Sequence, residues 1–194
     1  SQLGIVDDVN GNFNLVFEKD SIDFTRSVDD GKSWSKPLQI SENGQHPCIS
    51  SDSRGFLYVA WLNENDEIYF KRSQDGGITW SNCIGTGKKG NIHQVPAIAV
   101  DSLFNIYLIF TGETSDQASW FSYCDDIYYC RSIDNGNSWT NSVELMNQPG
   151  FFGIFNPCVQ VDPEGNVFAL WAISFDIQDF PPEETHIYFT RSED

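Results

Sequence analysis

The sequence predicts an all-β protein in which about four similar units of short strands repeat along the chain, as the blades of a β-propeller do. Two observations predict this fold. An octet of the pattern S-x-D-x-G-x-[ST]-W begins at Ser27, Ser73 and Ser132, and its first residues occur again at Ser192. Each octet follows a run of alternating apolar residues that ends in arginine. Such runs are typical of half-buried strands, and no helical period of useful length competes with them.

Each octet is expected to form a hairpin turn. Its aspartate can accept hydrogen bonds from backbone N–H groups further along the turn, and its glycine supplies a positive φ. Its tryptophan offers a large ring that holds the turn against the sheet. The structural positions of the three complete octets are Ser27, Asp29, Gly31, Trp34, Ser73, Asp75, Gly77, Trp80, Ser132, Asp134, Gly136 and Trp139.

The strands are expected in short runs rich in Val, Ile, Phe and Tyr, bounded by Gly, Asn, Asp and Pro. The expected strands are Ile5–Asp7, Phe13–Phe17, Ile22–Arg26, Pro37–Ile40, Pro47–Ser51, Leu57–Trp61, Ile68–Arg72, Ser81–Ile84, Pro96–Val100, Ile106–Phe110, Ile127–Arg131, Ser142–Leu145, Pro157–Val161, Val167–Trp171 and Ile187–Arg191. They divide a single domain, residues 1–194, into units of about 1–46, 47–95, 96–156 and 157–194, of which the last is truncated.

Two charged positions recur outside the octets. An aspartate precedes the turn between the first two strands of each unit, at Asp8, Asp52, Asp101 and Asp162. An arginine closes each third strand, at Arg26, Arg72, Arg131 and Arg191. A catalytic group is needed once per protein, whereas the octet aspartates and these arginines recur once per unit. We therefore expect the octet aspartates to serve turns, and not catalysis or calcium binding, and the arginines to close blade edges and not to bind a substrate.

Composition limits the partners. The chain has 28 acidic and 11 basic residues among 194, and its net charge is −17. This balance argues against nucleic acid and anionic membranes, while it permits calcium; no other cofactor or metal site is indicated. No apolar run is long enough to span a membrane. There is neither a visible signal peptide nor an initiator methionine, so we expect a processed or recombinant piece.

The five cysteines do not have the spacing of a metal site. They are Cys48, Cys83, Cys124, Cys130 and Cys158. Their odd number leaves at least one unpaired, and buried free thiols are favoured over a disulfide.

The octets, with the surrounding run PAIAVDSLFNIYLIF…DIYYCRSIDNGNSW, resemble the Asp-box, or BNR repeat, of sialidase-like β-propellers. The resemblance covers nearly all of the chain and implies a secreted or surface-associated propeller. It also implies that each box lies between a third and a fourth strand, away from the active-site face. The same box occurs in sialidases, other glycoside hydrolases, sorting receptors and non-catalytic binding propellers, so the box does not select an activity.

Sialidase chemistry, as the resemblance implies it, needs three arginines on the substrate carboxylate, a tyrosine nucleophile paired with glutamate, and an aspartate acid/base. Bidentate arginine is well suited to a carboxylate. This chain has five arginines: four at the repeated position, and Arg54 in a turn expected on the octet face. The Arg-Ile-Pro motif of the family is absent. No arginine triad can be assembled, and no catalytic residue is assigned.

The long departures from the repeat join second to third strands, or a fourth strand to the next unit. These are residues 85–95, 112–126, 147–156 and 173–185, which a propeller places on the face opposite the octets. Aromatic rings and carboxylates suit sugars, and the candidate ligand-binding residues are His93, Trp120, Tyr123, Phe151, Phe152, Asp176 and Asp179. The alternative is that the rings pack against each other. A catalytic pair such as Asp176 with Asp116 is conceivable, but solvated acidic loops are favoured.

Three and a half units do not close a ring of six or seven blades. The sequence predicts either a fragment of a larger propeller, which is favoured because Asp194 falls inside an octet, or copies that associate. The leading interpretation of function is a non-catalytic propeller, extracellular or at the cell surface, that binds carbohydrate or protein through its long-loop face. The alternatives are part of a sialidase-like glycoside hydrolase whose catalytic residues lie mostly outside this chain, and an assembly module.

Overall fold

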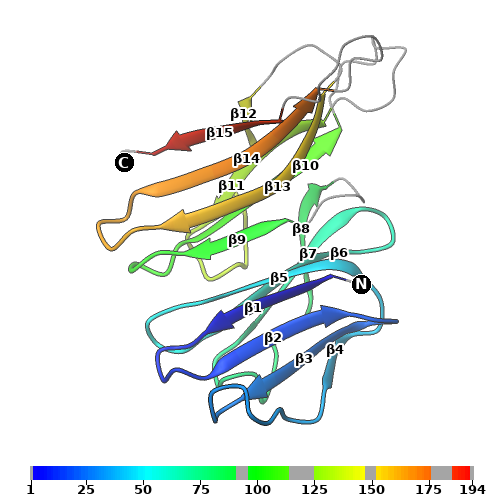
Figure 1. Cartoon of the computed structure of the whole chain (residues 1–194), viewed down its shortest axis with the longest axis vertical. Coiled ribbons are helices and arrows are strands. Elements are labelled where there is room, and N and C mark those ends of the chain that lie inside the picture. Colours follow the sequence, from blue (N-terminus) through cyan, green and yellow to red (C-terminus); the bar gives the residue numbers. More distant parts are fainter. Residues whose placement is uncertain (1, 91–95, 114–124, 147–151, 176–184, 193–194) are drawn as a thin grey trace.

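The structure is a computed structural model that describes residues 2–90, 96–113, 125–146, 152–175 and 185–192. These residues form fifteen β-strands in four antiparallel sheets, and the described part of the chain has no helix (Figure 1). None of its segments is therefore a helix with the length and hydropathy needed to span a bilayer.

Each sheet is a meander whose strands follow one another in sequence order. The first sheet comprises β1 (Leu3–Asp7), β2 (Phe13–Glu18), β3 (Ile22–Ser27) and β4 (Leu38–Ser41). The second comprises β5 (Gln45–Ser51), β6 (Leu57–Leu62), β7 (Glu67–Ser73) and β8 (Ile84–Lys89). The third comprises β9 (Ala97–Val100), β10 (Ile106–Glu113), β11 (Asp125–Ser132) and β12 (Val143–Met146). The fourth comprises β13 (Phe152–Val161), β14 (Val167–Phe175) and β15 (Thr185–Arg191). We call these sheets blades 1 to 4.

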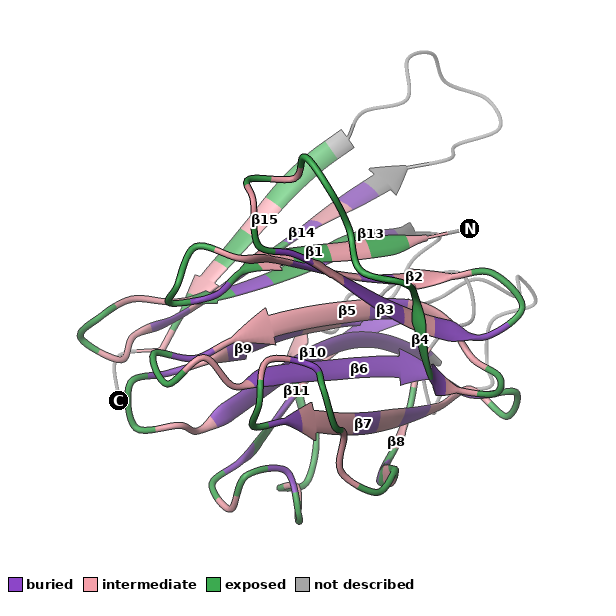
Figure 2. Cartoon of the chain, turned by 90° about the horizontal axis from the view of Figure 1, so that it is seen from below, coloured by how far each residue is buried: buried purple, intermediate pink, exposed green. Residues whose placement is uncertain are grey.

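The core lies between successive blades, because each central strand sends alternate side chains to the blade on either side. Along β6, for example, Val59 packs against blade 1 while Ala60 packs against blade 3. Every residue of β6 is buried as a result, whereas β1 and β15 at the two ends of the arc carry exposed side chains (Figure 2). The innermost strands β1, β5, β9 and β13 lie next to one another and line the axis of the arc.

The structure confirms the expected strands, with two corrections at their ends. The fourth strand of blade 2 was expected at Ser81–Ile84, but β8 runs from Ile84 to Lys89. Thr86 accounts for the shift, because its hydroxyl donates to the carbonyl of Ile68 at 2.8 Å and holds this segment on β7. The strands of blades 3 and 4 are also longer than expected. Residues 112–113, 125–126, 152–156 and 173–175, expected in loops, belong to strands.

The turns divide the molecule into two faces. The octets and the turns between the first two strands of each blade lie at one end of the strands, on the left in Figure 1, which we call the octet face. The β2–β3 and β6–β7 turns and the β4–β5 connection lie at the other end, which we call the long-loop face.

Candidate functional site

The three octets form the same hydrogen-bonded turn. In the third, the hydroxyl of Ser132 donates to Asp134 at 2.8 Å and accepts from the backbone N–H of Gly136 at 2.8 Å. The carboxylate of Asp134 also accepts from the backbone N–H of Ser138 at 2.9 Å and from its hydroxyl at 2.6 Å. The octets that begin at Ser27 and Ser73 repeat these bonds within 0.1 Å. Every oxygen of each octet carboxylate therefore accepts a bond within its own turn.

These bonds stabilise the ionised carboxylates. Hydrogen bonds from Ser138 lower the pKa of Asp134 to about 2, and those from Ser33 lower the pKa of Asp29. At Asp75, burial raises the pKa, but the bonds from Thr79 and Ser73 outweigh it and the pKa is lowered. A general acid needs a carboxyl that holds its proton near neutral pH. The octet aspartates do the opposite, which supports their role in turns.

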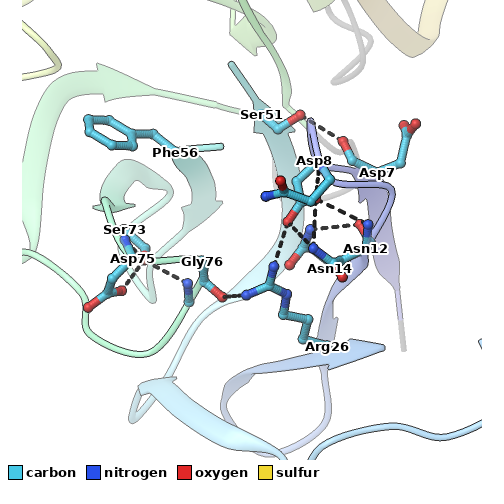
Figure 3. Close-up of polar contacts among 12 residues, drawn as sticks. Asp7, Asp8, Asn12, Asn14, Arg26, Ser51, Phe56, Ser73, Asp75 and Gly76 are labelled. Atoms are coloured by element: carbon cyan, nitrogen blue, oxygen red, sulfur yellow. Dashed lines mark hydrogen bonds and ion pairs between the residues drawn. The ribbon is translucent and has the colours of Figure 1, made fainter. Parts of the chain in front are cut away.

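Arginine joins each of the first two blades to the next octet. Arg26 donates through Nη2 to the buried carboxylate of Asp8 at 2.8 Å and through Nη1 to the carbonyl of Gly76 at 3.1 Å (Figure 3). Arg72 donates in the same way to the carbonyl of Asn135. These arginines were expected to close blade edges and not to bind a substrate. The structure adds that Arg26 and Arg72 also connect two blades, which the sequence could not show because the acceptor is a backbone carbonyl of the next unit.

Arg54 also bridges blades. It forms an ion pair with Asp52, and its guanidinium lies 3.4 Å from the ring centroid of Phe104 in blade 3. Tyr58 donates to the same carboxylate at 2.8 Å. Burial raises the pKa of Tyr58, and the bond to Asp52 raises it further, so this hydroxyl stays protonated.

All five arginines of the chain lie on the octet face. In the strand register, Arg131 lies opposite Tyr107 and Arg191 lies opposite Phe168. Both positions are next to the turn that precedes the second strand of the blade. Arg26, Arg54 and Arg72 occupy the contacts given above. The long-loop face therefore receives no arginine from this chain.

Two polar contacts lie on the long-loop face of blades 1 and 2, and we call the residues that form them the polar cluster: Glu18, Asn43, His46 and Glu64. Glu18 accepts from the backbone N–H of His46 at 3.0 Å, and Asn43 donates to Glu64 at 2.6 Å. Asn43 and Glu64 are exposed, so their remaining lone pairs and N–H group face solvent.

The β4–β5 connection is held in place by a close approach of backbone to a buried ring. Gly44 has φ +136°, and a Cβ at this position would overlap the indole of Trp61. Only glycine therefore lets the connection lie flat on Trp61. The connection then enters β5 through His46, which has φ +56° directly before Pro47.

The polar cluster was not predicted, because its residues lie at short connections between strands and not in the long insertions. One sequence feature could have drawn attention to this region, namely the residue that directly precedes the proline of an innermost strand. His46 and Asn156 both have a positive φ before proline, and β5 and β13 both carry a β-bulge there. A residue before proline strongly prefers extended backbone, so this conformation is held by the surrounding structure.

The role of the predicted ligand residues remains a prediction. His93, Trp120, Tyr123, Phe151, Asp176 and Asp179 lie outside the described residues. Phe152, expected in a loop, is the first residue of β13 and is paired with Phe175. These strand ends lie on the long-loop face.

The described residues contain no cluster of three or more His, Cys, Asp or Glu side chains able to hold a metal ion. Cys48, Cys83, Cys130 and Cys158 are free thiols, and Cys124 lies outside the described residues. Burial raises the pKa of both Cys48 and Cys130 to about 12, so neither is a reactive thiolate.

No protein-family model matches the chain. Solved structures share its fold. An α-L-arabinanase from Penicillium chrysogenum, complexed with arabinobiose, is similar with a TM-score of 0.69 and 18% identity over 99% of this chain. An ulvan lyase is similar with a TM-score of 0.66 and 14% identity over 97%, and the endosialidase of phage phi92 with 0.68 and 14% over 97%. Together with the four antiparallel sheets, these structures establish the β-propeller fold.

This chain is shorter than the proteins it resembles. It spans 62% of the arabinanase chain, 55% of the lyase and 34% of the endosialidase. Among curated proteins, ribulose-5-phosphate reductase 1 of Staphylococcus aureus is 25% identical over 99 residues, which make up 50% of this chain and 29% of the reductase.

Proposed function

We propose that this chain is a non-catalytic propeller that binds a carbohydrate through its long-loop face. The observation that carries the proposal is the position of the arginines. All five lie on the octet face, so this chain offers no arginine group to grip a sugar carboxylate on the long-loop face. The octet carboxylates are likewise occupied in their turns. Binding through the long-loop face leaves intact both the arginine contacts on the octet face and the hydrogen bonds of the octet turns.

The ligand class follows from the chemistry of that face. The exposed amide and carboxylate of Asn43 and Glu64 are suited to sugar hydroxyls, which donate and accept hydrogen bonds. A net charge of −17 and the lack of arginine there favour a neutral glycan over a sialylated one. The predicted ring residues Trp120, Tyr123, Phe151 and Phe152, with His93, Asp176 and Asp179, belong to the proposal as stacking and polar partners. The arabinobiose bound to a propeller of this fold supports the same class. A protein ligand on this face is the alternative.

The second candidate is a piece of a glycoside hydrolase. It is favoured by the similarity to the arabinanase. Because this chain spans only 62% of that enzyme, the rest of a similar enzyme would lie outside it. Its catalytic residues would lie mostly outside this chain. A glycan array combined with a panel of fluorogenic glycosides separates the two candidates. Binding without turnover supports the proposal, whereas turnover that a long-loop carboxylate substitution abolishes supports the hydrolase.

The face assignment has its own test. Asn43→Ala, Glu64→Gln, Trp120→Ala and Phe152→Ala are each expected to weaken glycan binding at least several-fold. Ser35→Ala, on the octet face, is the matched control and is expected to leave binding unchanged. If all four long-loop variants bind as the wild type does, the face assignment is wrong. An extracellular or surface location belongs to this proposal and rests on the glycan ligand. Calcium remains permitted by the charge, and dialysis against a chelator should leave glycan binding unchanged.

A further inference from the structure

We propose that Asn43, in the β4–β5 connection, is a site of spontaneous covalent modification, at which the side-chain amide is lost as ammonia and aspartate or isoaspartate is formed. The neighbouring Gly44 and Ser41 promote the reaction. Asparagine is a thermolabile residue, and a following glycine favours its conversion because no Cβ hinders ring closure. This inference does not depend on the proposed function.

The reaction uses only groups of this chain and water. The backbone nitrogen of Gly44 gives up its proton to hydroxide, and its electron pair forms a bond to Cγ of Asn43. The bond from Cγ to Nδ2 breaks, and Nδ2 takes a proton from water and leaves as ammonia. Water then opens the five-membered imide. Cleavage between the nitrogen and Cγ gives aspartate, and cleavage between the nitrogen and the backbone carbonyl carbon gives isoaspartate.

The fold distinguishes three identical dipeptides. The Asn–Gly sequence occurs at Asn10–Gly11, Asn43–Gly44 and Asn135–Gly136. The N–H of Gly11 donates to the carbonyl of Asp8 at 2.8 Å, and the N–H of Gly136 donates to the hydroxyl of Ser132 at 2.8 Å. Each of these bonds must break before the nitrogen can attack. Among the described residues, no group accepts a hydrogen bond from the N–H of Gly44, so this nitrogen is available.

The carbonyl beside the attacking nitrogen stabilises the charge that develops. The hydroxyl of Ser41 donates to the carbonyl oxygen of Asn43 at 2.7 Å. When Gly44 loses its proton, the negative charge is shared with this oxygen by resonance, and a hydrogen bond to the charged form favours it. The carbonyl of Asn135 also receives a bond, from Arg72, but the glycine that follows Asn135 keeps its own N–H bound.

The surroundings keep this dipeptide both accessible and necessary. Asn43 is exposed, and its one side-chain bond among the described residues runs from Nδ2, the group that leaves, to Glu64 at 2.6 Å. The fold requires the glycine, because a Cβ at Gly44 would overlap the indole of Trp61. A larger residue, which would slow the reaction, is therefore excluded at this position.

Both products disturb the contacts of the β4–β5 connection. Aspartate has no amide to donate to Glu64 and places a second carboxylate beside it, which like-charge repulsion disfavours. Isoaspartate adds a methylene to the backbone directly before Gly44, where the chain lies against Trp61. The converted protein should therefore unfold at a lower temperature than the fresh protein.

Mass spectrometry on the aged chain tests the proposal. The protein is incubated at mildly alkaline pH, once folded and once in urea, and after proteolysis each conversion is counted as a gain of about 1 Da. We expect Asn43 to convert several-fold faster than Asn10 and Asn135 in the folded chain. In urea the three should convert at similar rates, because the hydrogen bonds that distinguish them are gone. If Asn10 or Asn135 converts as fast as Asn43 in the folded chain, the proposal is overturned.

A pair of serine variants tests the hydrogen bond to the carbonyl. Ser41→Ala should slow the conversion of Asn43 several-fold and leave that of Asn10 unchanged. Ser51→Ala is the matched control, because its hydroxyl makes a similar bond to the carbonyl of Asp7 at 2.8 Å. This control should leave the rate at Asn43 unchanged, and circular dichroism checks that both variants fold. An unchanged rate at Asn43 in Ser41→Ala, or an equal slowing in Ser51→Ala, would also overturn the proposal.

Discussion

Phe24 of blade 1 and Trp80 of blade 2 pack edge to face, with ring centroids 5.3 Å apart and planes at 69°. Fifty-six positions separate them in sequence. The contact gives the octet a role that its local pattern does not reveal. An octet closes a turn within its own blade and also covers the third strand of the preceding blade. The first octet has the same sequence pattern without that second contact, and this difference allows matched tests.

Trp80→Ala should destabilise the fold by about 2–4 kcal/mol, because it removes a half-buried ring from the junction between blades. Trp34→Ala should cost well under 1 kcal/mol, since Trp34 is 41% exposed. Urea unfolding measures both. Equal losses for the two variants would contradict the junction role of the octet tryptophan.

Two separate features require glycine in the octet turn: a positive φ, and the closeness of a phenylalanine ring of the preceding blade. Gly31, Gly77 and Gly136 have φ of +79°, +88° and +85°, which alanine adopts at a cost of about 1 kcal/mol. Only Gly77 and Gly136 also lie so close to a phenylalanine that a Cβ would overlap its ring. Gly31→Ala should therefore cost about 1 kcal/mol and Gly77→Ala clearly more. Thermal unfolding would refute this reasoning if Gly31→Ala were the more damaging change.

Arg26 should be coupled energetically to Asp8. Arg26→Met leaves the carboxylate of Asp8, whose side chain is 1% exposed, without its charged partner. We expect a loss of about 1–3 kcal/mol, and a smaller additional loss when Asp8→Asn is combined with it. Lys32→Met is the control, because Lys32 and Asp30 form a solvent-exposed pair at 4.0 Å. Strict additivity of the Arg26 and Asp8 substitutions in denaturant unfolding would show that the pair is not coupled.

The octet carboxylates predict acid sensitivity. The pKa of Asp134 is lowered to about 2 in the folded protein from an ordinary value of 3.8. The unfolded chain therefore takes up the proton first as the pH falls. The stabilisation by the ionised carboxylate is complete above about pH 4 and disappears as the pH falls toward 2. Asp134→Asn should be less stable than the wild type at pH 7, and the difference should shrink on acidification. A difference that is constant from pH 7 to pH 2.5 in urea titrations would exclude this linkage.

The strands were predictable because their pattern is local. A strand such as Leu57–Leu62 is bounded by an aspartate turn before it and an Asn-Glu-Asn-Asp turn after it, so its limits follow from residues within ten positions. The end of blade 2 was misplaced because the apolar pattern around Ile84 is weak. There the hydroxyl of Thr86 and the backbone of β7 decide the pairing.

The candidate site was predictable only in part. The rule that octets and long loops lie on opposite faces follows from the meander, and the positions of all five arginines agree with it. The polar cluster was missed because Glu18, Asn43, His46 and Glu64 come from three separate turns with no motif in common. The β4–β5 connection that carries Asn43 is held by the close approach of Gly44 to the indole of Trp61 in blade 2.

The sequence by itself determined the repeat, the hairpin turns and the all-β class, because these depend on short-range hydrogen bonds and on the alternation of apolar residues. Only the tertiary structure decided what each repeated residue does between blades. It showed that Arg26 and Arg72 reach the next octet, that Phe24 and Phe70 lie under the next tryptophan, and that the corresponding residues of blades 1 and 4 are open to solvent. The same local sequence pattern therefore has different environments, because burial in a propeller is set by the neighbouring blade and not by the turn itself.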